Sequence, residues 1–298
     1  MSENITHTAV TDDCARLALH SPEICEAFKI ALGERLEIAR LGGVTRSGAK
    51  FVVPLLERIR QEWPSRQDSN GLVDKLAFVL GWLCHRAADL QMKPVFREAD
   101  AGCALSPTDC SVYHDVYLFR EVYGSGQEAP YVPETLEAGM ASSAAARAVR
   151  VDEIEGVLRA LWQRALIALH TFIPDQEDID GWLERLFKLR QRFYVDLHRY
   201  AEAFAVPDPD KVRRFIVDTH FYDLQDAVIR LARSIQRGEP DGTIDLDAAI
   251  RDAASQSQYA QALRRGTLYL QAASDFFEGR IARESLMDAL ERGKQGVS

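Results

Sequence analysis

The stretch LVDKLAFVLGWLCHRAADLQM, residues 72–92, is the most apolar helix-like segment of the chain. Its apolar side chains recur every three or four positions, which is typical of a helix packed into a core. The turn signal Ser69-Asn70-Gly71 precedes it, and Lys93-Pro94 follows it. Because proline inside a helix removes a backbone hydrogen bond, we expect this helix to end before Pro94. The stretch therefore predicts a central helix against which other helices pack.

The rest of the chain shows the same helical periodicity, and the two-residue alternation of strands is scarce. Ser21-Pro22 predicts a helix start, and Gly42-Gly43 predicts the end of that helix. Further helices are expected over 51–63, 107–123, 134–149, 152–172, 180–204 and 210–237, followed by two or three short helices. These patterns predict an all-α, multi-helix bundle of about ten helices.

One segment predicts a boundary within the bundle. Gly238-Glu239-Pro240-Asp241-Gly242 is the strongest linker signal in the chain. We therefore expect a helical core domain over 1–237 and a C-terminal helical appendage over 243–298. His7 is expected to lie in an N-terminal tail and is given no role, whereas His20, directly before Ser21, is expected in a turn near the core.

Composition excludes several classes of function. The 298 residues include 36 Lys and Arg against 45 Asp and Glu, which gives a net charge of −9. This acidic balance argues against nucleic acid and against an anionic membrane surface as partners. A secretory signal pattern is absent, and apolar runs are too short for a transmembrane helix. The sequence thus predicts a cytoplasmic protein with no stable membrane insertion and no nucleic acid partner.

The sharpest chemical feature is the pair His85 and Asp89. Four residues apart on a helix, the two side chains project from one face about one turn apart. That spacing suits two ligands of one metal ion, or a histidine oriented by a carboxylate. It also fits a buried His–Asp pair that only satisfies its own hydrogen bonds, and the spacing alone favours this simpler interpretation.

The helix predicted after Ser106-Pro107 carries a second set of polar residues. Cys110, His114 and Glu121 fall on one stripe of it, and Asp115 follows His114. An inward-facing His114 could complete a site begun by His85 and Asp89. Taken alone, however, the pattern favours polar residues at the rim of an amphipathic helix. Nucleophile elbows, phosphate-binding glycine loops, Cys-x-x-Cys pairs and His-Glu-x-x-His are all absent from the sequence.

The segment from Leu76 to Asp89, followed by Lys93-Pro94, resembles the bacterial zinc-dependent phospholipase C-like family. The resemblance covers roughly residues 17–125. It implies an all-α bundle of the phospholipase C-like type with His85, Asp89 and His114 as metal ligands, and His20 as an early ligand. Lys93 stands where the family has histidine, which implies one or two ions of zinc, or of another divalent transition metal, instead of three.

If these residues bind a metal ion, we expect the protein to be a phosphoester hydrolase. Zinc held by three protein ligands keeps an open position and activates a bound water. Asp115 and Glu121 are then the candidate base or supporting acid, and Arg86 and Lys93 are candidates for holding the phosphate of a small phosphoester substrate. Two alternatives stay open. One is a non-catalytic all-α interaction protein with a degenerate hydrolase-like core and an unidentified protein partner, and the other is a helical protein in which His85 and Asp89 are only a buried pair.

Overall fold

The computed structural model describes residues 4–44, 52–67, 70–103, 107–124 and 177–291, and all regular secondary structure within them is helical. The all-α prediction is therefore confirmed for these residues. The helices expected over 134–149 and 152–172 lie outside the described residues. None of the helices in the described part of the chain combines the length and apolar character that a membrane span requires.

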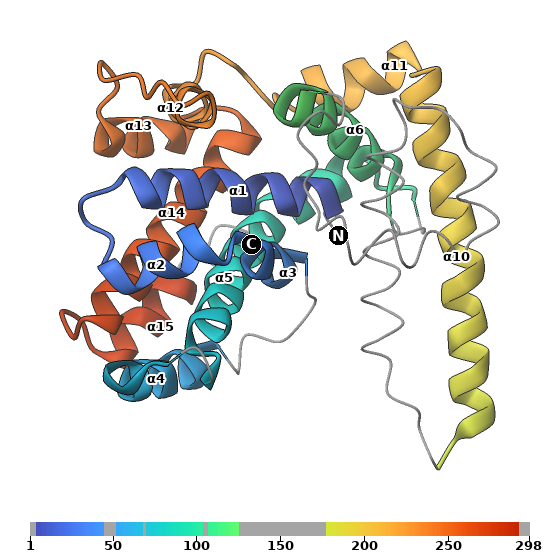
Figure 1. The fold of residues 1–298 in the computed structure, drawn as a ribbon. Helices are drawn as coiled ribbons and strands as arrows, with labels where there is room; N and C mark the ends of the chain where they lie inside the picture. The colour runs from blue at the N-terminus through green and yellow to red at the C-terminus, as the bar shows by residue number, and fades with distance from the viewer. Residues whose placement is uncertain (1–3, 45–51, 68–69, 104–106, 125–176, 292–298) are drawn as a thin grey trace.

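Three helices form the centre of the molecule, and α1 (Asn4–His20) runs across the other two in Figure 1. It packs against α5 (Leu72–Ala99) and α14 (Gln258–Phe277), which also pack on each other. Each of the three helices contributes fully buried apolar side chains to the core, such as Val10, Leu80 and Leu270. The core thus joins the first, middle and last parts of the chain.

The other helices lie around this centre (Figure 1). On one side lie α2 (Glu26–Glu34), α3 (Leu36–Val44), α4 (Val52–Glu62) and α15 (Arg283–Glu291). The other side is formed by α6 (Asp109–Tyr123), α10 (Ile179–Ala205), α11 (Pro209–Val212), α12 (Ala227–Gln236) and α13 (Leu246–Asp252). Short 3₁₀ turns follow α4 at 63–65 and α13 at 253–255, and a π-helical turn over 213–217 follows α11.

The N-terminal helix α1 was not expected from the sequence, which predicted a tail. Its first backbone N–H groups receive a side-chain partner from far along the chain, because the Asp115 carboxylate accepts hydrogen bonds from the backbone N–H of Ile5 and Thr6. A helix start needs such acceptors, and they usually come from the residue just before the helix. Here the acceptor for these two N–H groups lies on α6, and the sequence around the helix start does not reveal this contact.

Two buried carboxylates fix α1 against four other helices. Asp12 accepts two hydrogen bonds from Arg40 on α3, at 2.7 and 2.9 Å, and one from the hydroxyl of Tyr123 on α6. Asp13 pairs with Arg233 on α12 and accepts a hydrogen bond from the hydroxyl of Tyr259 on α14. Buried charges are tolerated only when they are paired and hydrogen-bonded in this way. This network explains how a helix rich in threonine and aspartate lies in the core.

Glycines allow α3 to approach α5 and α1 closely. A β-carbon on Gly81 would lie 1.7 Å from the backbone oxygen of Ala39, and one on Gly42 would lie 2.1 Å from that of Phe78. The missing side chains of these two glycines therefore permit α3 to pack closely on α5. A helix was expected to end at Gly42-Gly43; α3 includes both glycines and its last described residue is Val44, within one residue of the predicted end.

Several helix boundaries differ from the predictions. The helix expected from Ser21-Pro22 is divided at Arg35 into α2 and α3, and α5 continues through Pro94 to Ala99. The single helix expected over 210–237 is interrupted, because the chain turns at His220, whose φ is 47°. That turn places the Phe221 ring against His114, so tertiary packing outweighs the helical pattern. By contrast, α4, α6 and α10 begin and end close to where they were predicted.

The last helices share the core of the expected first domain. In α14, which belongs to the appendage expected over 243–298, Tyr259, Leu263 and Leu270 are fully buried. A β-carbon on Gly266 would lie 2.5 Å from the Sγ of Cys14 on α1. Residues that follow the Gly/Pro linker therefore help to hold α1 in place.

Candidate metal centre

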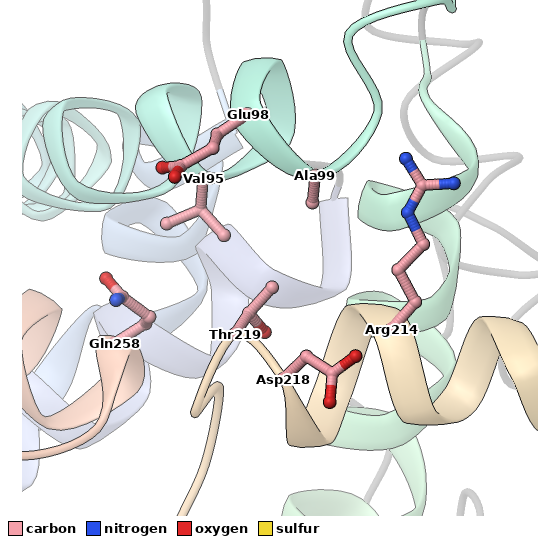
Figure 2. Close-up of a pocket in the computed structure, with 7 residues that line it drawn as sticks. All are labelled: Val95, Glu98, Ala99, Arg214, Asp218, Thr219 and Gln258. Carbon is pink, nitrogen blue, oxygen red and sulfur yellow. The ribbon is translucent and has the colours of Figure 1, made fainter.

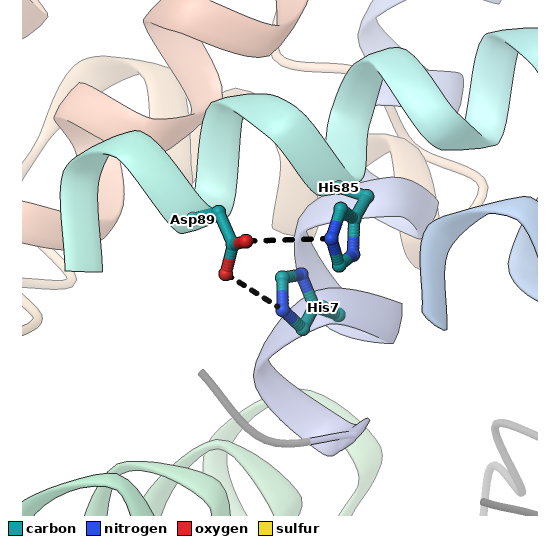
Figure 3. Close-up of side chains that lie close together, drawn as sticks. All are labelled: His7, His85 and Asp89. Atoms are coloured by element: carbon teal, nitrogen blue, oxygen red, sulfur yellow. Dashed lines mark ion pairs between the residues drawn. The ribbon is translucent and has the colours of Figure 1, made fainter. Parts of the chain in front are cut away.

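Three potential metal ligands meet where α1 crosses α5, and Figure 3 shows their side chains directed toward one another. His7 comes from α1, and His85 and Asp89 come from α5. The Nε2 atom of His7 lies 3.4 Å from one Asp89 oxygen, and the Nε2 atom of His85 lies 3.4 Å from the other. One ligand atom from each residue lies within 4.8 Å of the other two. The described residues thus contain a compact group of two imidazoles and one carboxylate.

The ring of His85 is oriented by a backbone group. Its Nδ1 lies 2.9 Å from the carbonyl oxygen of Gly43 on α3, so Nδ1 carries the proton and donates it in a hydrogen bond. The neutral ring then has its lone pair on Nε2, which faces Asp89. Metal-binding histidines are usually fixed by a hydrogen bond of this kind from the second ring nitrogen. His85 is therefore held in the tautomer that a metal ligand needs.

Electrostatics give His7 and Asp89 charge states that suit metal binding. Burial of His7, with the nearby His85 ring, lowers its pKa from 6.5 to about 4, so the imidazole is neutral at pH 7. Burial alone would raise the pKa of Asp89, but the interactions of its carboxylate with the His7 and His85 imidazoles outweigh burial, and the pKa lies well below its ordinary value. A neutral imidazole and an ionised carboxylate are the forms that bind metal.

The spacing of the three side chains is compatible with ligand atoms around one metal ion. An N–H···O hydrogen bond usually joins atoms about 2.7–3.2 Å apart, and both His–Asp distances are 3.4 Å. Ligand atoms at about 2.1 Å from a tetrahedral zinc ion are separated by about 3.4 Å. The rings of His7 and His85 also lie nearly parallel, with centroids 4.2 Å apart. Each His–Asp distance thus has the length of one edge of such a tetrahedron, and the two distances end on the two different oxygens of Asp89.

The centre has one side near the surface. The side chains of His7 and His85 are 5% and 8% exposed, whereas those of Asp89 and Lys93 are 16% and 39% exposed. Lys93 lies one helical turn after Asp89, and its Nζ atom is 2.5 Å from Asp89 Oδ2. The histidines therefore form the buried wall of the centre, and a lysine ammonium group stands at its more exposed edge.

His114 and Asp115, which the sequence offered as further site residues, have other roles. The Nε2 atom of His114 lies 2.7 Å from the Phe215 carbonyl oxygen, and its ring stacks on Phe221 at 3.6 Å. Burial lowers the pKa of His114 to about 3. Asp115 accepts hydrogen bonds from the start of α1 and from the Tyr200 hydroxyl, and burial raises its pKa to about 6 despite these bonds. Neither residue joins the metal ligands, so their predicted roles as ligand and base are replaced by packing and capping.

Three other predicted site residues also point elsewhere. Arg86 donates hydrogen bonds to the Leu290 carbonyl oxygen on α15, so it does not face the centre. Glu121 is exposed near the end of α6, and His20 is exposed at the end of α1, four helical turns from His7. Of the predicted residues, the structure therefore brings His85, Asp89 and Lys93 together.

The residue that sequence reasoning missed is His7. A signal for its helix was present, because apolar residues recur at intervals of four residues, in the pair Ile5 and Ala9 and in the series Val10, Cys14 and Ala18. Such a pattern indicates a buried helix face and places His7 within a helix instead of a tail. The cluster with α5 still depends on how the two helices cross, and that crossing has no local signature.

A surface pocket lies apart from the metal centre, and Figure 2 shows the side chains that line it. It is formed by the end of α5, the π-helical turn and its following loop, and the start of α14, through Val95, Glu98, Ala99, Arg214, Asp218, Thr219 and Gln258. Two carboxylates and one guanidinium group give it mixed charge. Glu98 is nine residues beyond Asp89, which is half a helical turn out of phase, so the pocket opens on a different face of α5.

Comparison of the chain with protein-family models, with curated proteins and with solved structures finds no match. The residues of the metal centre are therefore the basis for a function.

Proposed function

We propose that this protein binds a divalent transition metal ion, zinc in the first place, through His7, His85 and Asp89, and that it hydrolyses a small phosphoester. The observation that carries the proposal is the hydrogen bond from His85 Nδ1 to the Gly43 carbonyl, which aims Nε2 at the carboxylate. Two imidazoles and one carboxylate form a ligand set used by catalytic zinc, and by non-haem iron as well. Iron and manganese are therefore included among the candidate ions.

The residues present fit the chemistry of such an ion. Three protein ligands would leave coordination positions open, and zinc held in this way lowers the pKa of a bound water to about 7, which provides a hydroxide to attack phosphorus. His7 and His85 close the centre on its buried side, so the open positions would face the edge formed by Asp89 and Lys93. The Lys93 ammonium group is placed to attract the phosphoryl oxygens there. The resemblance to zinc-dependent phospholipase C supports a phosphoester as substrate.

A second candidate function is a non-catalytic all-α interaction protein that retains the centre as a structural element. The ion pair between Lys93 and Asp89 favours it, because an ammonium group already neutralises the buried carboxylate without a metal. Such a protein would fold normally without a transition metal and would show no hydrolysis of phosphoesters.

The test is the metal content of purified, tag-free protein, measured after exposure to Zn²⁺ and removal of excess metal. Wild type is compared with His7→Ala, and His20→Ala serves as the matched control on the same helix. We expect one zinc per chain in wild type and in His20→Ala, and a strong loss in His7→Ala. Equal zinc in His7→Ala and wild type would overturn the proposed ligand set, and absence of zinc from both would favour the second candidate.

Activity is then measured on the same three proteins with phosphomonoester and phosphodiester substrates. A rate of hydrolysis that is high in the two zinc-binding proteins and low in His7→Ala supports the proposed reaction. Zinc bound without hydrolysis of either class would retain the metal site and overturn the hydrolase.

A further inference from the structure

The feature that remains to be explained is a lysine placed on a proposed metal ligand. Lys93 Nζ lies 2.5 Å from Asp89 Oδ2, the oxygen that also faces His85 Nε2. The two residues are separated by one helical turn, so the ammonium group reaches the carboxylate along α5 itself. It thus occupies the more exposed edge of the centre, where metal would approach.

From this geometry we infer that Lys93 is a built-in cation that competes with the metal for Asp89, and that a phosphate anion relieves the competition. This inference rests on the proposed function. The positive charge of Lys93 opposes a divalent ion held by the same carboxylate, so the lysine weakens metal binding. Its side chain is long and 39% exposed, which allows the ammonium group to leave Asp89 for solvent without rearrangement of the buried histidines.

When metal displaces Lys93 from Asp89, the positive charge of the ammonium group still lies close to the metal centre. Lys93 stays tethered one turn from Asp89, so the bound ion and the ammonium group lie side by side as two cations. Their repulsion is offset best by an anion that contacts both, and a phosphate group offers several oxygens for this purpose. Metal and phosphate should therefore bind cooperatively, each increasing the affinity for the other by the same factor.

The cation next to His85 on α5 does not serve the centre. Arg86, the neighbouring residue on α5, is engaged by the Leu290 carbonyl and Glu291 on α15. The next cation before it on α5 is Lys75, which donates to the Asn70 carbonyl oxygen at the start of the helix. Replacement of Lys93 therefore tests the competition for Asp89, whereas replacement of Lys75 tests the effect of net charge alone.

The experiment measures Co²⁺ affinity from the visible absorption of the bound ion, with and without inorganic phosphate. The variants are Lys93→Met, which removes the charge and retains length, Lys93→Arg, which retains it, and Lys75→Gln, which makes the same change in net charge elsewhere on α5. Without phosphate we expect Lys93→Met to bind Co²⁺ about tenfold more tightly than wild type. Lys75→Gln should match wild type, and Lys93→Arg should stay closer to wild type than Lys93→Met.

Inorganic phosphate is the second variable of the experiment. It should tighten Co²⁺ binding in wild type and have a much smaller effect in Lys93→Met. Equal Co²⁺ affinity in wild type and Lys93→Met would overturn the competition, and an equal effect of phosphate in both would overturn the coupling. Failure of every variant, including Lys93→Met, to bind Co²⁺ while retaining its helical circular dichroism would instead overturn the metal centre itself.

Discussion

The Nδ1 atom of His85 lies 2.9 Å from the carbonyl oxygen of Gly43, and this contact links the candidate site to the packing of the fold. Gly43 is placed there because α3 lies close to both α5 and α1. A β-carbon on Gly43 would lie 2.3 Å from Thr11 Oγ1, and the Thr11 hydroxyl in turn donates to the backbone oxygen of His7. One close approach of three helices therefore positions both histidines.

Replacement of Gly43 by alanine should disturb fold and site together. The added methyl group meets Thr11 on α1, and relief of this overlap must move α3 and the carbonyl that orients His85. We expect Gly43→Ala to lower the free energy of unfolding by about 1–3 kcal/mol and to weaken zinc binding. Urea denaturation and a competitive zinc titration measure the two effects.

The control is Gly33→Ala on α2, where the new β-carbon would lie 3.9 Å from a Leu19 side-chain atom, an ordinary contact. Because alanine favours a helix over glycine, this variant should gain up to about 1 kcal/mol and bind zinc as wild type does. Identical stability changes in Gly33→Ala and Gly43→Ala would contradict the packing argument.

Asp115 should matter for stability far more than Glu121, although both were candidate catalytic acids. Asp115 is buried and accepts hydrogen bonds from Ile5, Thr6 and Tyr200. Asp115→Ala leaves these donors unpaired at the start of α1, so we expect a loss of about 3–5 kcal/mol in the free energy of unfolding. Glu121→Ala, on the exposed side of α6, should change it by less than about 0.5 kcal/mol. Similar losses in the two variants would show that Asp115 does not cap α1.

Local signals predicted the elements whose ends are determined locally. The helix α6 begins after Thr108, whose side chain accepts from the Ser111 N–H, and ends at Gly124 in the left-handed region. Both features are visible in the sequence. The continuation of α5 through Pro94 and the break before Phe221 depend on tertiary contacts, and periodicity could not reveal them.

The residues of the candidate site also differ in whether local sequence or tertiary packing brings them together. His85 and Asp89 belong to one helix, so their spacing alone placed them together. His7 is 78 residues before His85, and it reaches the centre because Asp12, Asp13 and Asp115 fix α1 through contacts with distant helices. Paired acidic residues in a polar-looking segment normally indicate exposure, and their arginine partners are identifiable only once the chain is folded.

His114 should make the protein sensitive to acid. Its pKa is about 3 in the folded protein because it is buried, against 6.5 in an unfolded chain. Between these values the unfolded state binds more protons, so stability is retained above pH 6.5 and falls as the pH is lowered. For this residue alone we expect a loss of about 2 kcal/mol between pH 7 and pH 5.

The measurement compares wild type with His114→Gln by urea denaturation at both pH values, in a chelating buffer that keeps the centre metal-free. The difference between the two proteins isolates His114 from His7, whose lowered pKa acts in the same direction, and from Asp115, whose raised pKa acts in the opposite one. A wild-type protein no more sensitive to pH than His114→Gln would show that His114 is not buried in its neutral form.

Removal of residues 243–298 should abolish cooperative unfolding instead of releasing an intact core. The helix α14 contributes Tyr259, whose hydroxyl donates to Asp13, and the fully buried Leu270. Without them, α1 loses both apolar contacts and a partner for a buried carboxylate, and His7 loses its support. Thermal unfolding followed by circular dichroism should show a broad transition for the truncated chain, and its zinc binding should be lost.

A pair of leucines on α14 provides the matched control in the full-length chain. Leu270 is fully buried and Leu268 is 36% exposed. Because a buried leucine leaves a cavity when shortened, Leu270→Ala should lower the free energy of unfolding by about 2–5 kcal/mol, and Leu268→Ala by much less. If the truncated protein melts as sharply as wild type and the two leucine variants have equal effects, the packing argument is wrong. The C-terminal segment would then be the appendage that the linker sequence predicted.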